Sequence, residues 1–474
     1  MYRLDRFLVK REPLKYTLPW ARIVAEEPTL VLNKDGSIQT TFRYRGPDLD
    51  SAIKEQLSIM TQKLNSVFMA METGWVMFFE AQRIPSTDYP TDSYFQDPIT
   101  KIMDDERRAY FSSGDSHFES DYYATLYWMP PNDHEGRLRS FVVEGKKQKG
   151  LTREDYLSTF RTVVNEVCQM FIACQIPCET LSPDEMVSYL YSTVSMHRRK
   201  IRLPKHPLLL DQFLCDSALS GGLEPRLGEK HMRVITIIGY MDNTIFGIFD
   251  ALNLQNFSYR WISRYYCLGK LDALDAVGKK TKEWKAKFKS LMDMLREFTT
   301  GKEDDSNINQ TAVAKYQQSK QAEGLIESDI TSYGYYTSCI VILGNSPDEA
   351  DMRAKTIVQT INNIGFKAKM EDLNSVDAWM GTLPGNVGRN VRRHLVSCAN
   401  LVHMMPLSTI WAGDSRNHHL DGPPLLYTQT SGNTPFRLSL HVGDVGHTLV
   451  VGPTGAGKSV FLNMVEASFR KYKN

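Results

Sequence analysis

The 474-residue chain lacks an excess of charge of either sign. Lysine and arginine number 56 and aspartate and glutamate 55, so the net charge is +1 at pH 7. Without a global positive field, the chain has no general attraction to nucleic acid or to an anionic membrane. A histone-like or polybasic protein is therefore excluded, and any contact of that kind must be local.

Paired cysteines and long apolar runs are also absent. The seven cysteines are odd in number and include no Cys-x-x-Cys pair, which favours free thiols in a reducing compartment over disulfides or a zinc site. The richest apolar stretches have the length of a strand, short of the roughly 18 residues that cross a bilayer. The first residues scatter charge where a signal peptide would be apolar. We therefore expect a cytoplasmic protein.

Two common enzyme motifs are missing as well. The sequence contains no Gly-x-Ser-x-Gly element and no His-Glu-x-x-His helix, so serine-hydrolase and zinc-peptidase chemistry have no support. His418 and His419 are adjacent but have no second ligand pair at metal spacing, which favours a surface loop over a metal site.

What the chain does contain is an ordinary globular composition, with 42% hydrophobic and 23% charged residues. Its length predicts two to four domains. Strands and helices without a pure βα repeat predict an α+β fold with mixed sheets and packed helices. We expect one α+β subdomain over 1–200, a second over 201–400 and a further unit over 401–474.

In the first 200 residues, Asp35-Gly36 predicts a hairpin within 29–46, because Asp-Gly accepts the positive φ of a tight turn. The remaining patterns predict a helix from about 53 to 71, strands over 75–83 and 120–131, and a helix over 153–173. The basic run 197–202 is better explained as an interdomain loop than as a phosphate contact.

The following 200 residues predict a similar mixture. We expect strands over 231–240, 257–268, 335–343 and 366–370, a short helix near 244–254, a long helix near 272–298, a flexible linker over 301–311 and a helix over 347–364. The long helix carries the stripe of Trp284 and a series of lysines: Lys279, Lys280, Lys282, Lys285, Lys287 and Lys289. A solvated face explains these lysines better than membrane or DNA contact.

The letters Ser-Pro-Asp-Glu occur twice, from Ser182 and from Ser346. Each predicts a capped helix start, since serine caps the first turn and glutamate reaches back to it. The aromatic-led strands SDYYATLYW and SYGYYTSCIVIL add a second similarity. An internal duplication would explain both, although capping chemistry also recurs by chance.

One motif carries chemistry. The eight residues Gly452, Pro453, Thr454, Gly455, Ala456, Gly457, Lys458 and Ser459 satisfy Gly-x-x-x-x-Gly-Lys-Ser. In such a phosphate-binding loop, or Walker A motif, backbone N–H groups point inward at an anion, the lysine reaches the β and γ phosphates of ATP, and the serine hydroxyl coordinates Mg²⁺. We expect a buried strand over 447–451 before the loop and a helix from about Gly457 after it.

Fifteen residues follow Ser459, and one helix uses them. A nucleoside triphosphatase also needs a second acidic strand end for Mg²⁺ and a group that positions water. We therefore expect the first βα unit of an incomplete RecA-like domain, with no complete catalytic set and little or no ATP hydrolysis by this chain alone.

The chain resembles the conjugative-transfer ATPases of type IV secretion systems, and among them the TrbE-like members. The resemblance rests on blocks in the family's order: NKDGSIQTTFRYRGPDLDS, SHFESDYYATLYWMPP, LPG at 383–385, PLSTIWAG at 406–413 and TPFRLSLHVGDVGHTLVVGPTGAGKS. It implies an N-terminal region that docks on the inner-membrane part of the machine, a motor that assembles into a hexamer or a hexamer of dimers, and a nucleotide site at Gly452 to Ser459.

Three functions are compatible with these observations. The first is an ATPase-family subunit that energises assembly of a secretion or conjugation machine and substrate transfer. The second is a non-enzymatic docking module at the cytoplasmic base of the channel, with a silent nucleotide loop. The third is a motor that contacts DNA directly, which would need a basic, aromatic-rich face that the balanced charge does not indicate.

Overall fold

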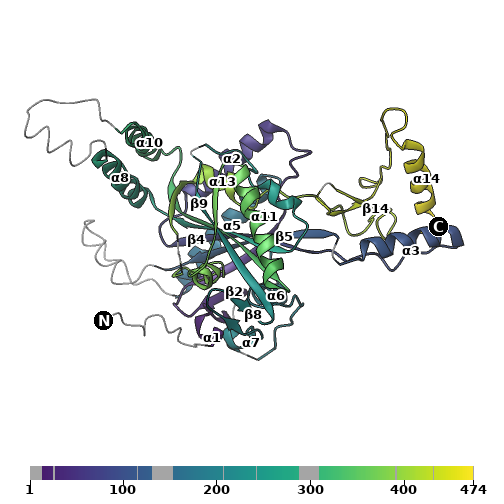
Figure 1. Ribbon diagram of the computed structural model, residues 1–474, viewed down its shortest axis with the longest axis horizontal. Helices are drawn as coiled ribbons and strands as arrows, with labels where there is room; N and C mark the ends of the chain where they lie inside the picture. The colour runs from purple at the N-terminus through teal and green to yellow at the C-terminus, as the bar shows by residue number, and fades with distance from the viewer. Residues whose placement is uncertain are drawn as a thin grey trace, which may run out of the picture.

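The computed structural model describes residues 13–24, 27–114, 116–130, 153–206, 208–241, 243–287, 309–389, 392–430 and 432–472. A large sheet forms the centre of the molecule, and helical extensions leave it on two opposite sides (Figure 1). The α+β class is confirmed. The sheet is not mixed, however, because every strand pairing in the described residues is antiparallel.

The first half of the sheet and its helices come from the first 200 residues. In chain order they are α1 (Leu14–Thr17), β1 (Trp20–Val24), β2 (Glu27–Asn33), β3 (Ile38–Tyr44), α2 (Lys54–Met69), β4 (Trp75–Pro85), α3 (Pro98–Phe111), β5 (Phe118–Trp128), α5 (Arg153–Ala173), β6 (Cys178–Thr180) and α6 (Pro183–Val194).

The second half follows in the same manner. Its elements are α7 (Leu210–Phe213), β7 (Leu219–Ser220), β8 (Arg226–Leu227), β9 (Lys230–Gly239), η2 (Asp250–Leu254), β10 (Tyr259–Cys267), α8 (Lys270–Ala286), α10 (Gln310–Glu327), β11 (Tyr333–Gly344), α11 (Pro347–Asn363), β12 (Lys367–Met370), α12 (Ser375–Met380), β13 (His394–Ser397) and α13 (Cys398–Met404).

The two halves repeat one strand arrangement. The strand order is β1-β2-β3-β5-β4 in the first half and β10-β11-β9-β8-β7 in the second, with β6 paired to β3 and β12 paired to β9. Adding six to a strand's number therefore gives its counterpart. The halves meet where β4 pairs antiparallel with β10, as an approximate twofold axis between these two strands would produce.

This repeat agrees with only one of the two sequence similarities. The aromatic-led strands are β5 and β11, which are counterparts. The two capped helices are α6 and α11, which occupy different places in the repeat. Ser182 and Glu185 form the complete reciprocal box, whereas Glu349 accepts from the backbone of Asn345. The capping letters therefore recur independently of the repeat.

Side chains alternate between the two faces of the sheet, as the pleat requires. Along β4, Met77, Phe79 and Ala81 enter a core that α2, α5, α11 and α13 cover. Val76 and Phe78 point to the opposite face, where α6, α7 and α12 lie. Each face thus has its own apolar layer, and both layers run across the junction of β4 with β10.

Most predicted elements of the two halves are confirmed. The hairpin of β2 and β3 pairs Leu32 with Ile38, and Gly36 in its turn has φ +86°. The predicted helix near 244–254 is a short 3₁₀ helix at 250–254. The long helix begins at Lys270 and is helical to Ala286, while 288–298 lie outside the described residues. The divisions at 200 and 400 stay predictions.

The predicted linker over 301–311 is wrong at its C-terminal end. Residues 301–308 lie outside the described residues, but Asn309 caps α10, and Gln310 and Thr311 are in its first turn. Helix α10 has no bulky apolar stripe that could predict it, because its buried residues are Ala312, Ala322 and Ile326. Small side chains let α10 pack closely on Ala273 and Val277 of α8, and the two helices form one extension (Figure 1).

Beyond residue 404, the chain runs to the opposite side of the sheet. It forms the small hairpin of β14 (Leu426–Gln429) and β15 (Pro435–Leu438) and ends in α14 (Lys458–Phe469). These elements lie beside α3, the helix that connects β4 and β5 in the sequence and extends away from the sheet (Figure 1). In the described residues, no helix has both the length and the apolar character that a membrane crossing requires.

Candidate functional site

The predicted phosphate-binding loop is a loop in the structure, and it leads directly into α14. Gly455 and Gly457 have φ values of +83° and +82°, a region that side chains with a Cβ rarely adopt. A Cβ built on either glycine would have no neighbour within 4 Å. The glycines are therefore required by the backbone conformation, and the space around them is open.

The loop presents backbone donors and one ammonium group. Within the described residues, the backbone N–H groups of Gly455, Gly457 and Ser459 donate to no carbonyl. The Lys458 ammonium turns back into the loop and donates to the carbonyls of Gly452 at 2.7 Å and Pro453 at 2.8 Å. Free N–H groups, a helix N-terminus and a lysine within reach of the same loop are the groups that bind phosphate.

The buried strand predicted before the loop is wrong. Residues 447–451 form no strand, and Leu449 and Val451 are 87% and 80% exposed. An isolated apolar run does not form a strand, because its backbone groups need a neighbouring strand to pair with. None of the strands in the described ranges pairs with this segment. The helix start predicted near Gly457 is confirmed, since Gly457 is the N-cap of α14.

The far end of α14 is held by α3. Lys471 is 4% exposed, and its ammonium lies 3.3 Å from the carbonyl of Pro424 and 3.9 Å from a carboxylate oxygen of Asp104 on α3. Asp104 also accepts from the Tyr89 hydroxyl at 2.8 Å. The helix that follows the loop is thus fixed to α3, which lies between β4 and β5 in the sequence.

The charge of Lys471 carries a cost that depends on pH. Burial lowers the pKa of Lys471 to about 8. The carboxylates of Asp104 and Asp92 raise this pKa in part, whereas Arg107 and Arg108 lower it further. Because this pKa lies below that of an unfolded lysine, the folded chain binds fewer protons between about pH 8 and pH 10.4. Folding therefore becomes more favourable as the pH rises through that window.

We predict that the stability of wild type and the stability of Lys471→Met depend differently on pH. The free energy of unfolding of wild type should rise relative to the variant by about 2 kcal/mol between pH 7.5 and 10.5. Urea unfolding followed by tryptophan fluorescence measures this difference. Lys101→Met, which replaces an exposed lysine of α3, should show no such trend. A relative stability of wild type that falls with pH would contradict the prediction.

Other polar groups noted in the sequence lie on the surface. His418 and His419 are exposed in a turn, where His419 stacks on His441. The run 197–202 is a loop, as predicted. On α8, Lys279 pairs with Asp275 at 2.6 Å and Lys280 with Glu283 at 2.8 Å. These exposed ion pairs are typical of a solvated helix face.

Sequence reasoning missed the buried charged residues of the sheet. Glu80, Arg83 and Arg264 are each at most 2% exposed. They occupy inward positions of β4 and β10, where the alternation of a strand would place apolar side chains. A charged residue at an inward position of a strand is the signal that could have identified them.

Family models match two separate stretches of this chain. The N-terminal domain of the type IV secretion system ATPase VirB4/TrbE matches residues 29–136. The CagE, TrbE, VirB family, a component of the type IV transporter system, matches residues 284–392.

Individual relatives extend the similarity over the chain. The conjugal transfer protein TrbE of Rhizobium radiobacter is 31% identical over 96% of this chain and 57% of its own length. The chain belongs to the VirB4/TrbE family. The VirB4 protein of Bartonella henselae is 22% identical over 98% of this chain and 58% of its own length. The type IV secretion system protein PtlC of Bordetella pertussis is 20% identical over 94% of this chain and 54% of its own length.

The two family models match this chain outside the loop. The chain spans about half the length of these curated relatives, 57% of TrbE from Rhizobium radiobacter and 58% of VirB4 from Bartonella henselae. Neither matched range of the VirB4/TrbE models includes residues 452–459. The matches of the family models therefore come from residues outside the loop, and the interpretation of the loop as a phosphate-binding site rests on its own residues and geometry.

Proposed function

We propose that this chain is a nucleotide-binding subunit of a type IV secretion or conjugation machine, in which ATP energises assembly of the apparatus and transfer of substrate. The observation that carries the proposal is the loop at 452–459, where two left-handed glycines, free N–H groups and Lys458 lie together at the start of α14. The family name, type IV secretion system ATPase, supports the same function.

The residues fit Mg²⁺-ATP in their chemistry. The backbone of Gly455 to Ser459 would bind the phosphates, and open space surrounds both glycines where a phosphate oxygen must approach. The Ser459 hydroxyl would hold Mg²⁺, which neutralises phosphate charge when bound. Lys458 would exchange its two carbonyl contacts within the loop for phosphate oxygens. This loop and α14 would be the beginning of a RecA-like unit.

The proposed surroundings follow from the family. Relatives named as conjugal transfer and type IV secretion proteins imply partners within that machinery. We propose a hexameric assembly that is cytoplasmic and reaches the inner membrane through protein partners. Direct contact with DNA is not favoured, because Lys279 and Lys280 of α8 are paired with Asp275 and Glu283.

The test of nucleotide binding is Lys458→Ala in the 474-residue chain. With Mg²⁺ present, wild type should bind a fluorescent ATP analogue, and the variant should bind it at least about tenfold more weakly because it lacks a charge-assisted contact to phosphate. Lys101→Ala, at an exposed lysine on the neighbouring α3, should bind as wild type does. Equal affinity in wild type and Lys458→Ala would refute the proposal.

Turnover then separates the enzymatic function from the alternative, a docking module at the base of the channel. Lys458-dependent hydrolysis of ATP at about 1 per second, within the usual range for enzymes, would support an active ATPase. Binding without turnover is the result that we expect of this chain with either function, so it would leave the docking module as an alternative. The specific observation behind that alternative is the exposed 447–451 segment, which leaves the loop without a strand beside it.

A further inference from the structure

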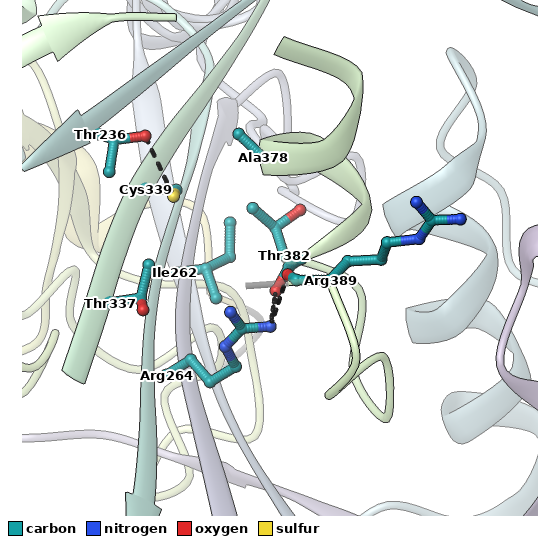
Figure 2. A pocket seen from close by; sticks show the side chains of 9 residues that line it. Thr236, Ile262, Arg264, Thr337, Cys339, Ala378, Thr382 and Arg389 are labelled. Atoms are coloured by element: carbon teal, nitrogen blue, oxygen red, sulfur yellow. Dashed lines mark hydrogen bonds between the residues drawn. The ribbon is translucent and has the colours of Figure 1, made fainter. Parts of the chain in front are cut away.

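Arg264 of β10 is a buried cation without a carboxylate partner. It is 2% exposed and lies between the sheet and the loop that follows α12, as Figure 2 shows. None of the ion pairs among the described residues involves it. A charge removed from water is costly unless it is compensated.

Only one edge of the Arg264 guanidinium is well satisfied. Its Nη1 donates to the carbonyls of Gly381 at 2.9 Å, Asn386 at 3.0 Å and Arg389 at 3.2 Å. Its Nε is buried and has no acceptor. Neutral carbonyls satisfy donors without neutralising the charge, and the face of the Tyr266 ring, whose centroid lies 5.3 Å from the guanidinium carbon, compensates it only in part. Burial lowers the pKa of Arg264; Tyr266 and Cys339 act in the opposite direction, and nearby Arg393 lowers it further.

The surroundings of Arg264 are positive overall. Arg389 pairs with Asp377 at 2.9 Å, and Arg392 makes a two-bonded pair with Glu371 at 3.0 and 3.2 Å. These two acidic groups are therefore already matched. Arg264 and Arg393 remain without an acidic partner in the ion pairs of the described residues.

A small cavity adjoins the guanidinium. It encloses about 10 Å³ of free space. Its lining includes the apolar side chains of Ile262 and Ala378 and four more polar residues: Thr236, Thr337, Cys339 and Thr382 (Figure 2). That space admits one small occupant, such as a water molecule or a monatomic anion. Arg389, whose side chain is half exposed, also lines it.

We propose that this cavity binds a chloride-sized anion next to the free Nε of Arg264. A water molecule would satisfy the donor but would leave the buried Arg264 without a counter-charge, whereas an anion does both. The loop at 381–389, which includes the LPG residues, would then be fixed to β10 by its carbonyls and by the anion together. Trp20 adds a separate contact to this loop, donating to the carbonyl of Pro384 at 2.7 Å.

Arg83 of β4 provides a matched comparison. It is 1% exposed and has no carboxylate partner either, but its Nε donates to Gln255 and its Nη2 to Gly432, each at 2.6 Å. Its donors thus have acceptors, and it does not line the cavity beside Arg264. Arg83 is expected to bind no anion.

Chlorine-35 NMR of sodium chloride solutions tests the proposal on the 474-residue chain. Wild type and Arg83→Lys should broaden the chloride signal in a saturable manner. Ala378→Leu, which fills the cavity and changes no charge, should lose this broadening, and so should Arg264→Lys. Equal broadening by wild type and Ala378→Leu would overturn the proposal, as would the absence of saturable broadening by wild type.

Thermal unfolding gives a second readout that does not depend on Arg264 variants folding well. Replacing gluconate by chloride at constant ionic strength should raise the unfolding midpoint of wild type by about 1 °C or more, because the anion binds the folded chain only. Ala378→Leu should show no chloride-specific rise. A rise of equal size in Ala378→Leu would overturn the proposal.

Discussion

The Gly46→Ala variant is expected to lose about 3 kcal/mol or more of unfolding free energy, measured by urea unfolding. Gly46 follows β3, and its carbonyl accepts from the Thr409 hydroxyl at 2.8 Å. A Cβ on Gly46 would lie 1.4 Å from the backbone carbonyl oxygen of Leu407. Since that obstacle is backbone, no side-chain rotation relieves the collision, and one of the two segments must move.

Gly324→Ala is the matched control for this prediction. Gly324 lies inside α10, and a Cβ there would meet nothing within 4 Å. Alanine favours a helix interior over glycine by roughly 1 kcal/mol, so this variant should be slightly more stable than wild type. If Gly46→Ala matched wild type in stability, the close approach of 46 to 407 would be wrong.

The contact at Gly46 shows a limit of sequence reasoning. The blocks RYRGP and PLSTIWAG are both visible in the sequence, and the resemblance to a family rested on them. Their contact joins residues more than 360 positions apart, and neither block has a sequence pattern that indicates contact with the other. Tyr44, whose hydroxyl donates to the carbonyl of Pro406 at 2.5 Å, makes the same long-range link.

Local chemistry explains which elements could be predicted. The turn at Gly36 and the cap at Ser182 are formed by residues close in sequence, so the local sequence is sufficient to predict them. Helix α10 was missed because its packing uses alanine, which gives no pattern of bulky residues. The strand over 447–451 was predicted from its apolar letters, but a strand depends on a neighbour that its own sequence does not encode.

The candidate site follows the same division. The positive φ values of Gly455 and Gly457 and the start of α14 were predictable, because spacing and residue type determine them. The return of the Lys458 ammonium to its own loop and the hold of α3 on Lys471 were not. Both depend on where a flexible side chain finds oxygen atoms, and for Lys471 those atoms come from 47 and 367 residues away in the sequence.

The junction of the two halves of the sheet contains the other substitution with a large expected effect. Glu80 of β4 is 1% exposed and accepts from Arg260 at 2.6 Å, from Gln82 at 2.9 Å and from Tyr189 at 2.9 Å. Arg260 lies on β10, which pairs with β4. It is the one cation among these three donors, so it alone compensates the buried carboxylate.

We predict that Arg260→Met lowers the free energy of unfolding by about 3–5 kcal/mol, because it leaves a buried carboxylate without its counter-charge. Adding Glu80→Gln should restore most of the loss, since a neutral amide needs no counter-charge. Arg416→Met removes an exposed pair with Asp421 and should cost less than about 1 kcal/mol. Urea unfolding of the four proteins measures these differences. If the double variant were no more stable than Arg260→Met, the loss would come from packing at the junction, and the electrostatic explanation would be wrong.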